Sequence, residues 1–144
     1  MKTLGELIEG KPIFVVEKGL SVREVAEYMA LNNVGAVPVL EGGIMAGIFS
    51  ERDLLVRCVA KDLDLNSTIV DDVMTKKVIL MESHDTYEDC INLMRQEGIR
   101  HVPVREGNRL LGVISLRDLM QLDVEEKEQK IDILHSYIHY NPKG

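Results

Sequence analysis

The sequence predicts a mixed α/β (α+β) fold built from two similar halves, and three observations lead to this prediction. The segment Ile13–Leu55 aligns with Val78–Met120 without a gap, at an offset of 65 residues. In both segments, short apolar runs of strand length alternate with stretches whose apolar residues follow helical spacing. In both, a glycine-containing turn separates two such apolar runs. A repeat of this length indicates one supersecondary unit used twice.

Each copy is expected to begin with a strand and a helix. The strands are predicted at 13–16 and 78–81, where four apolar residues in a row precede polar ones. The helices are expected to start after Ser21 and Thr86, which are favourable N-cap residues. In the first helix, Val22, Val25, Ala26 and Met29 have the spacing of one buried face, as do Cys90, Ile91 and Met94 in the second.

A hairpin and a second helix complete each copy. The turns at 41–43 and 106–108 contain glycine and asparagine, which tolerate the positive φ of tight hairpins. The strand after each turn ends at Ser50 or Ser115, and a helix is expected to start there. The predicted order is therefore strand, helix, strand, strand, helix, twice.

The two copies are expected to form one unit. An isolated copy would expose an apolar face of its sheet, so the sheets should pack together around a pseudo-twofold axis. Short helical turns are predicted ahead of the copies, at 4–8 and 70–74. The expected boundaries are residues 1–60 for the first repeat, 61–68 for a linker, 69–122 for the second repeat and 123–144 for a tail. A separate tail helix is predicted at 125–140.

Composition narrows the classes of function. Of the 144 residues, 45% are hydrophobic, which is enough for a packed core. The net charge of -7 argues against non-specific binding of nucleic acid or of an anionic membrane. No apolar run approaches the roughly 20 residues of a membrane span, and the first residues lack the apolar core of a signal peptide, so a cytoplasmic location is expected.

Cysteine and histidine give little sign of a metal site. Cys58 and Cys90 lie on apolar helix faces, which predicts buried free thiols. His135 and His139 have a spacing that can hold a metal, but no third ligand is evident. Exposed histidines, or histidines at a dimer interface, are therefore favoured there.

The two strand-to-helix junctions carry the strongest functional pattern. Each reads glycine, two apolar residues, serine, any residue, arginine and aspartate, ending at Asp53 or Asp118. A serine cap leaves helix amides free to bind a phosphate. The aspartate can accept both hydroxyls of a ribose, and Arg52 or Arg117 can bind a phosphate.

A structural alternative exists for this pattern. Ser-x-x-Asp is close to the capping box, in which the acid folds back onto the amide of the cap residue and binds no ligand. A capping box explains Ser50, Ser115 and the two aspartates, but it requires neither the glycine nor the arginine. Because both recur in register, we favour a binding site.

A second pattern precedes the hairpin of the second copy. Arg100 and His101 enter a strand next to Pro103 and could donate to a phosphate. The first copy has the small, neutral Val34-Gly35-Ala36 there, so two sites would differ in charge. Two exposed polar residues at a strand start are the structural alternative.

No catalytic arrangement is evident. Catalysis would need a nucleophile with its base, a metal centre or paired acids. Ser50 and Ser115 show no histidine partner within their own repeat, so a binding protein is predicted rather than an enzyme.

From about Leu4 to Leu122 the chain resembles the CBS-domain pair, or Bateman module. The resemblance rests on Val-Pro-Val at 37–39 and 102–104, on the hairpins, and on the Gly-to-Asp junction in both halves. It implies sheets packed about a pseudo-twofold axis, two clefts for adenosine-containing ligands, and disc-like dimers.

The resemblance also implies roles for individual residues. Asp53 and Asp118 would hold ribose, Ser50 and Ser115 would support ribose or phosphate, and Arg100 and His101 would reach phosphates. Each cleft mixes the two repeats, which gives two sets: Asp118 with Ile13, Val34, Gly35 and Ala36, and Asp53 with Thr75, Val78, Ile99 and Arg100. Residues 9–12 contain one extra residue and no hydroxyl that matches Thr75, so unequal clefts are expected.

The expected function is that of a regulatory sensor. AMP, ADP or ATP is the expected ligand, with NAD and S-adenosylmethionine as alternatives, and no catalytic cofactor is expected. A homodimer and a regulated protein partner are the expected assemblies, with no membrane association. A ligand-free dimerisation scaffold and a small nucleotide hydrolase are the alternative functions.

Overall fold

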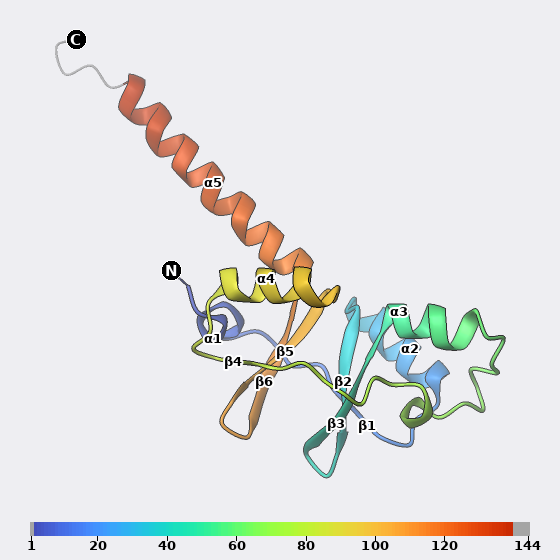
Figure 1. Cartoon of the computed structure of the whole chain (residues 1–144). Coiled ribbons are helices and arrows are strands. Elements are labelled where there is room, and N and C mark those ends of the chain that lie inside the picture. The colour runs from blue at the N-terminus through green and yellow to red at the C-terminus, as the bar shows by residue number, and fades with distance from the viewer. Residues whose placement is uncertain (1, 140–144) are drawn as a thin grey trace.

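The computed structural model describes residues 2–139, with side chains described for residues 2–131. Its strands form two three-stranded sheets, β1-β2-β3 and β4-β5-β6, which lie side by side (Figure 1). The strands are β1 (Val16–Glu17), β2 (Ala36–Glu41), β3 (Ile44–Ser50), β4 (Met81–Glu82), β5 (His101–Glu106) and β6 (Arg109–Ser115). The helices are α1 (Leu4–Ile8), α2 (Val22–Asn32), α3 (Glu51–Asp53), η1 (Leu54–Val59), η2 (Val70–Asp72), α4 (Tyr87–Glu97) and α5 (Leu116–His139). The mixed fold of two similar halves is confirmed.

The two sheets repeat each other down to their register. The first strand of each sheet runs parallel to the second, and the second and third form an antiparallel hairpin. Val39 lies opposite Gly47, and Val104 lies opposite Gly112, with an irregularity directly after each valine. Such agreement follows from the sequence repeat, because side-chain period and turn length fix the register of a hairpin.

The first strands are shorter and later than predicted. β1 and β4 contain two residues each, and only Val16 and Met81 belong to the predicted strands at 13–16 and 78–81. Val16 lies beside Val39 in the middle of β2. The residues before Val16 approach the sheet from the other half of the molecule, so they run along the junction between the halves instead of pairing with β2.

Local sequence explains where the helices and hairpins form. Ser21 caps α2 in a complete capping box with Glu24, and Thr86 caps α4 by accepting the amide of Asp89. Both hairpin turns have two residues, and they use positive φ at Gly42, Gly43 and Gly107. The predicted caps and turns are therefore confirmed.

The leading helical turns complete the core of the opposite half. Leu4 and Ile8 of α1 are buried with Met81, Cys90, Val102 and Ile114. Val70, Val73 and Met74, in and after η2, are buried with Val16, Val25, Val37 and Phe49. In Figure 1, α1 accordingly lies against the second half, and the chain then crosses to β1. The two halves are joined by these exchanged segments as well as by the contact between their sheets.

The helices after the junctions differ between the halves. α3 ends after one turn and continues as the wider π-helical turn η1, with the amide of Ala60 donating to Leu55 O at 2.8 Å. In the second half, α5 runs without interruption for 24 residues. The prediction of a separate tail helix at 125–140 was therefore wrong, because nothing between Leu119 and Glu125 breaks a helix.

Other predictions concern single residues and the membrane. Cys58 and Cys90 are buried free cysteines, as predicted. The side chains of His135 and His139 lie outside the described set.

Within residues 2–139, none of the helices combines the length and the apolar character needed to cross a bilayer.

Candidate functional site

Both predicted junctions form at the ends of β3 and β6. Ser50 Oγ accepts the amide of Asp53 at 3.2 Å, and Ser115 Oγ accepts the amide of Asp118 at 3.0 Å. In return, one carboxylate oxygen of each aspartate accepts the serine amide, at 3.0 Å for Asp53 and 3.2 Å for Asp118. The capping box weighed as the structural alternative is therefore present in both halves. It uses one oxygen of each carboxylate, so the surroundings of the other oxygen decide what each junction can bind.

A cavity of about 1180 Å³ opens beside Asp118, between the halves. The first half contributes the segment Val34–Ala36 and the α2 residues Ala26, Met29 and Ala30. The second half contributes Arg100, His101, Ser115, Arg117 and Asp118. An adjoining cavity of about 500 Å³ shares Pro12, Phe14, Val34, Val113, Asp118 and Gln121 with the larger one. Asp118 therefore stands where the two cavities meet.

The carboxylate of Asp118 keeps free capacity to accept hydrogen bonds. A carboxylate offers roughly four acceptor positions. Among the described residues, the Ser115 amide is the single donor to its side chain, and it bonds to Oδ2. Asp118 is exposed and stands in the first turn of α5. The remaining acceptor positions can receive hydroxyl groups from a molecule in the cavity.

Charged groups of both signs surround His101. A Cβ atom built on Gly35 would lie 2.9 Å from His101 Nε2 and 3.2 Å from Glu51 Oε1, so these two side chains meet at Gly35. Burial lowers the pKa of His101 from its usual 6.5; the carboxylates of Glu51 and Asp118 oppose this effect, and Arg100 adds to it. The ring is therefore mainly neutral at pH 7 and can both donate and accept a hydrogen bond.

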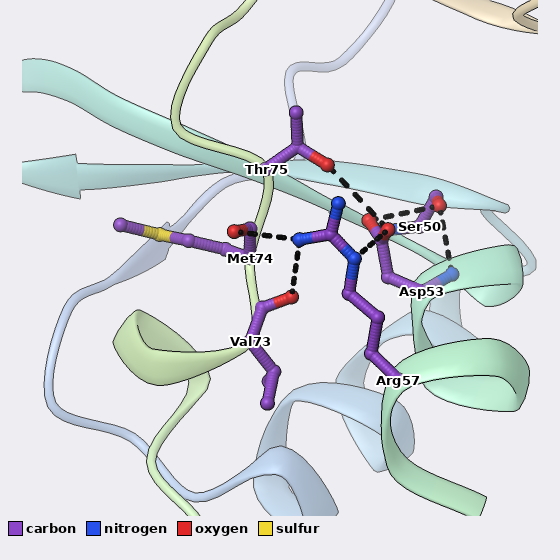
Figure 2. Close-up of polar contacts among 6 residues, drawn as sticks. All are labelled: Ser50, Asp53, Arg57, Val73, Met74 and Thr75. Carbon is purple, nitrogen blue, oxygen red and sulfur yellow. Dashed lines mark hydrogen bonds and ion pairs between the residues drawn. The ribbon is translucent and has the colours of Figure 1, made fainter. Parts of the chain in front are cut away.

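The junction at Asp53 has different surroundings (Figure 2). Thr75 Oγ1 and Arg57 Nε each lie 3.5 Å from Asp53 Oδ1, and Ser50 Oγ donates to Oδ2 at 3.0 Å. Arg57 Nη1 also donates to the carbonyl oxygens of Val73 and Met74, at 3.2 Å each. The side chain of Asp53 is 13% exposed, and it lines neither of the two cavities.

The predicted site residues thus fall into two groups. The first group lines the larger cavity: Val34, Gly35, Ala36, Arg100, His101, Ser115, Arg117 and Asp118. The second group lines neither cavity: Ile13, Ser50, Arg52, Asp53, Thr75, Val78 and Ile99. Of the second group, Ser50 and Thr75 contact Asp53 directly. The mixed set expected around Asp118 is brought together except for Ile13, whose neighbours Pro12 and Phe14 line the cavity instead.

Several lining residues were missed by the sequence analysis. On α5 they are Leu116, Met120, Gln121 and Val124, whose positions have helical spacing. That spacing was visible in the sequence, but the predicted break between the second repeat and the tail obscured it. Glu51 was missed because the equivalent residue of the second half is Leu116, so it carries no repeated signal.

His101 lies directly opposite Ser115 in the pairing of β5 with β6. The two residues are therefore neighbours across the hairpin, although the sequence analysis named no histidine beside Ser115. The two side chains are not hydrogen-bonded to each other in the part of the chain that is described, and Ser115 Oγ accepts the amide of Asp118. The pair lacks the hydrogen bond that would activate a serine nucleophile.

Comparisons with known proteins agree with this architecture. The CBS domain profile matches residues 5–59 and 70–125. The CBS domain-containing protein YhcV of Bacillus subtilis is 32% identical over 130 residues, which cover 88% of this chain and 92% of that protein. The solved structure of a protein with CBS domains from Burkholderia ambifaria has a TM-score of 0.81 at 32% identity, over 86% of this chain and 95% of the other.

A more distant structure shares the fold. The CBS domain pair of protein MJ0100, solved in complex with methylthioadenosine and S-adenosyl-L-methionine, has a TM-score of 0.78 at 21% identity, over 88% of this chain and 98% of the other. At that identity the likeness concerns the fold alone. The two matched segments and the relatives above 30% identity lead to one conclusion. This chain belongs to the CBS domain family and carries two copies of the domain.

Proposed function

We propose that this protein is a regulatory module that binds an adenosine-containing ligand in the cavity beside Asp118. The observation that carries the proposal is the mixed lining of that cavity. The acceptor Asp118 and the donors Arg100 and Arg117 come from the second half, and the apolar wall comes mainly from the first. A ligand that touches both halves can respond to, or change, their arrangement.

The lining of the cavity offers residues that suit each part of such a ligand. The ribose hydroxyls would donate to the free oxygen of Asp118. An adenine ring fits against the apolar side chains of Phe14, Met29 and Val34, and the guanidinium groups of Arg100 and Arg117 would bind phosphate. Ser115 holds the aspartate in place, since its hydroxyl accepts the aspartate amide and its own amide donates to the carboxylate.

The balance of charge favours a ligand with few negative charges. The cavity is lined by two arginines, two acids and a histidine that is mainly neutral at pH 7. Glu51 would repel part of a long phosphate chain, so AMP should bind more tightly than ATP. Because the acids also suit a cationic ligand, S-adenosylmethionine is the second choice, and protein MJ0100 was solved with that compound bound.

The output of the module runs through α5. The first turns of this helix line the cavity at Leu116, Arg117, Met120, Gln121 and Val124. The helix then projects from the second half (Figure 1), and its 24 residues span about 36 Å. A ligand that changes the angle of the first turns would move the far end of the helix several times farther than it moves those turns.

The exposed apolar residues of α5 favour association with a second chain. Met120, Val124 and Ile131 are 59%, 47% and 61% exposed and follow one stripe of the helix. A projecting helix is marginal alone and gains stability when another surface covers such a stripe. We therefore include a homodimer, joined partly through α5, in the proposal.

AMP titration of the full chain tests the ligand. AMP at 100 times its dissociation constant should stabilise the fold by about 2.7 kcal/mol, and Asp118→Ala should weaken binding at least tenfold in calorimetry. Asp89→Ala is the matched control: Asp89 occupies the same capping position in α4 and lines neither cavity. Equal AMP affinity in wild type and Asp118→Ala would refute the site.

Two alternatives give different results in the same preparation. A scaffold without a ligand shows no shift of melting temperature with AMP, ATP, NAD or S-adenosylmethionine. A hydrolase releases product from AMP or ATP, and His101→Ala abolishes the release. We expect binding without turnover, because Ser115 and His101 are not hydrogen-bonded to each other.

A further inference from the structure

We infer that the contacts of Arg57 with Asp53, Val73 and Met74, called the lock below, keep the Asp53 junction closed to ligands. The chain then binds one adenosine ligand, at Asp118, unless these contacts are broken. The inference rests on the proposed function for the nature of the ligand. The lock itself is a property of the fold and can be tested without any ligand.

Four groups of the protein itself surround the carboxylate of Asp53. Two donors reach Oδ2, namely the amide and the hydroxyl of Ser50, and two groups approach Oδ1, namely Thr75 Oγ1 and Arg57 Nε. Because a carboxylate has roughly four acceptor positions, a ribose hydroxyl would have to displace one of these four groups. The equivalent Asp118 has one described donor.

Arg57 also fixes the segment that covers Asp53 (Figure 2). Its Nη1 donates to the carbonyl oxygens of Val73 and Met74, so one guanidinium ties α3 and η1 to the chain leading into Thr75. Thr75 in turn exchanges two main-chain hydrogen bonds with Ile48, each 2.9 Å long. The segment is thus held at the edge of β3, against Asp53.

Glycine at position 47 permits this close contact. A Cβ atom there would lie 2.7 Å from Met74 Sδ and 2.8 Å from the carbonyl oxygen of Thr75. At the equivalent Gly112, the nearest atom to such a Cβ is Ile8 Cδ1, at 3.7 Å. The edge of β6 is therefore covered less tightly than the edge of β3, and Val113, the equivalent of Ile48, lines both cavities.

The second half lacks the locking residue. Arg57 stands four residues after Asp53, and the residue four after Asp118 is Leu122. Leu122 lines the smaller cavity and carries no charge with which to bind a carboxylate. The closed junction thus differs from the open one by this cation as well as by Thr75, although serine and aspartate are kept in both.

The decisive experiment counts AMP molecules bound per chain by calorimetry. Wild type should bind one, which Asp118→Ala removes and Asp53→Ala leaves in place. Arg57→Leu should bind a second AMP, and the double variant Arg57→Leu/Asp53→Ala should return to one. Arg23→Leu is the control, because it breaks an exposed ion pair with Glu27, likewise four residues away, outside both cavities.

Hydrogen exchange tests the lock independently of the ligand. Arg57→Leu should speed exchange of the Thr75 and Ile48 amides at least tenfold, and Arg23→Leu should leave both rates unchanged. Unchanged exchange in Arg57→Leu overturns the lock, whether or not AMP binds. The lock is also overturned if wild type binds two AMP molecules and Asp53→Ala binds one. It is overturned as well if Arg57→Leu exchanges these amides faster yet still binds one AMP molecule. If wild type binds no AMP while the exchange result holds, the proposed ligand fails and the lock stands.

Discussion

Gly35 of the first repeat and His101 of the second meet at the junction between the halves, where a Cβ atom on Gly35 would lie 2.9 Å from His101 Nε2. The imidazole can lie there because Gly35 has no side chain. This contact therefore links the two repeats through one residue from each.

Gly35→Ala should lower the free energy of unfolding by about 1–3 kcal/mol, as overpacking of a tight contact does. The cost should shrink by at least about 0.5 kcal/mol in the His101→Ala background, which gives a coupling energy typical of residues in contact. Urea denaturation of the four proteins measures the cycle. Additive costs would show that the strain arises elsewhere.

His101 should make the fold sensitive to mild acid. Burial lowers the pKa of its ring below 6.5, so the unfolded chain takes up a proton at a higher pH than the folded chain does. The contribution of the neutral ring to stability is complete above pH 6.5, and it declines as the pH falls towards the lowered pKa of the folded state. In this window the stability curve should lose up to about 1.4 kcal/mol per pH unit from this one group.

Thermal melts between pH 8 and pH 5 in wild type and His101→Gln measure this contribution as a difference in slope. His84→Gln is the control, because the side chain of His84 is 81% exposed and its nearest carboxylate oxygen, on Asp85, lies 3.9 Å away. A steeper loss in wild type than in His101→Gln is the expected result. Parallel curves for all three proteins would contradict it.

A cation introduced at Leu122 should close the open junction. Leu122→Arg places a guanidinium four residues after Asp118, the spacing of the Asp53–Arg57 pair. AMP affinity should then fall at least tenfold, because the new cation competes for the carboxylate. Leu122→Met keeps the volume and the lack of charge, and should bind as wild type does. If the Leu122→Arg variant folds and binds AMP normally, the carboxylate is not the contact that matters.

The base of α5 should depend on Tyr87. Its hydroxyl donates to Glu126 Oε2 at 2.9 Å and so ties α4 to α5. Glu126 and Glu88 both raise the pKa of Tyr87. Tyr87→Phe should cost about 1.5 kcal/mol, since the bond goes to a charged acceptor. In urea melts, Tyr28→Phe should cost much less, because no described residue hydrogen-bonds to the Tyr28 hydroxyl.

The fold could be predicted because its signals are local. Ser21 and Thr86 mark helix starts, the two-residue turns fix both hairpins, and the repeat doubles every signal. The continuity of α5 was missed for a different reason, because the similarity between the copies ends near Leu122 and the prediction ended the helix with it. A repeat boundary has no physical effect on a helix, whereas glycine or proline does.

The candidate site could be predicted at Asp118 and less well at Asp53. The lining by Val34–Ala36 was expected from the resemblance, but Ile13 was named in place of Pro12 and Phe14. That segment pairs with no strand, so no register shows which of its side chains face the cavity. Arg57 was missed because the second copy has Leu122 in its place, so the i,i+4 pair with Asp53 does not recur in the repeat. Its other partners, the main-chain oxygens of Val73 and Met74, cannot be recognised from the sequence.

Because the leading segments are exchanged between the cores, neither core can be completed until residues of the other repeat have been synthesised. As the chain leaves the ribosome, residues 1–60 emerge without Val70, Val73 and Met74, which fill the first core. Leu4 and Ile8 are made before their apolar partners, which begin at Met81 and are complete only when Ile114 and Leu119 have been made. Neither half can therefore be cut away by a simple truncation, since each cut removes part of the interior of the half that is kept.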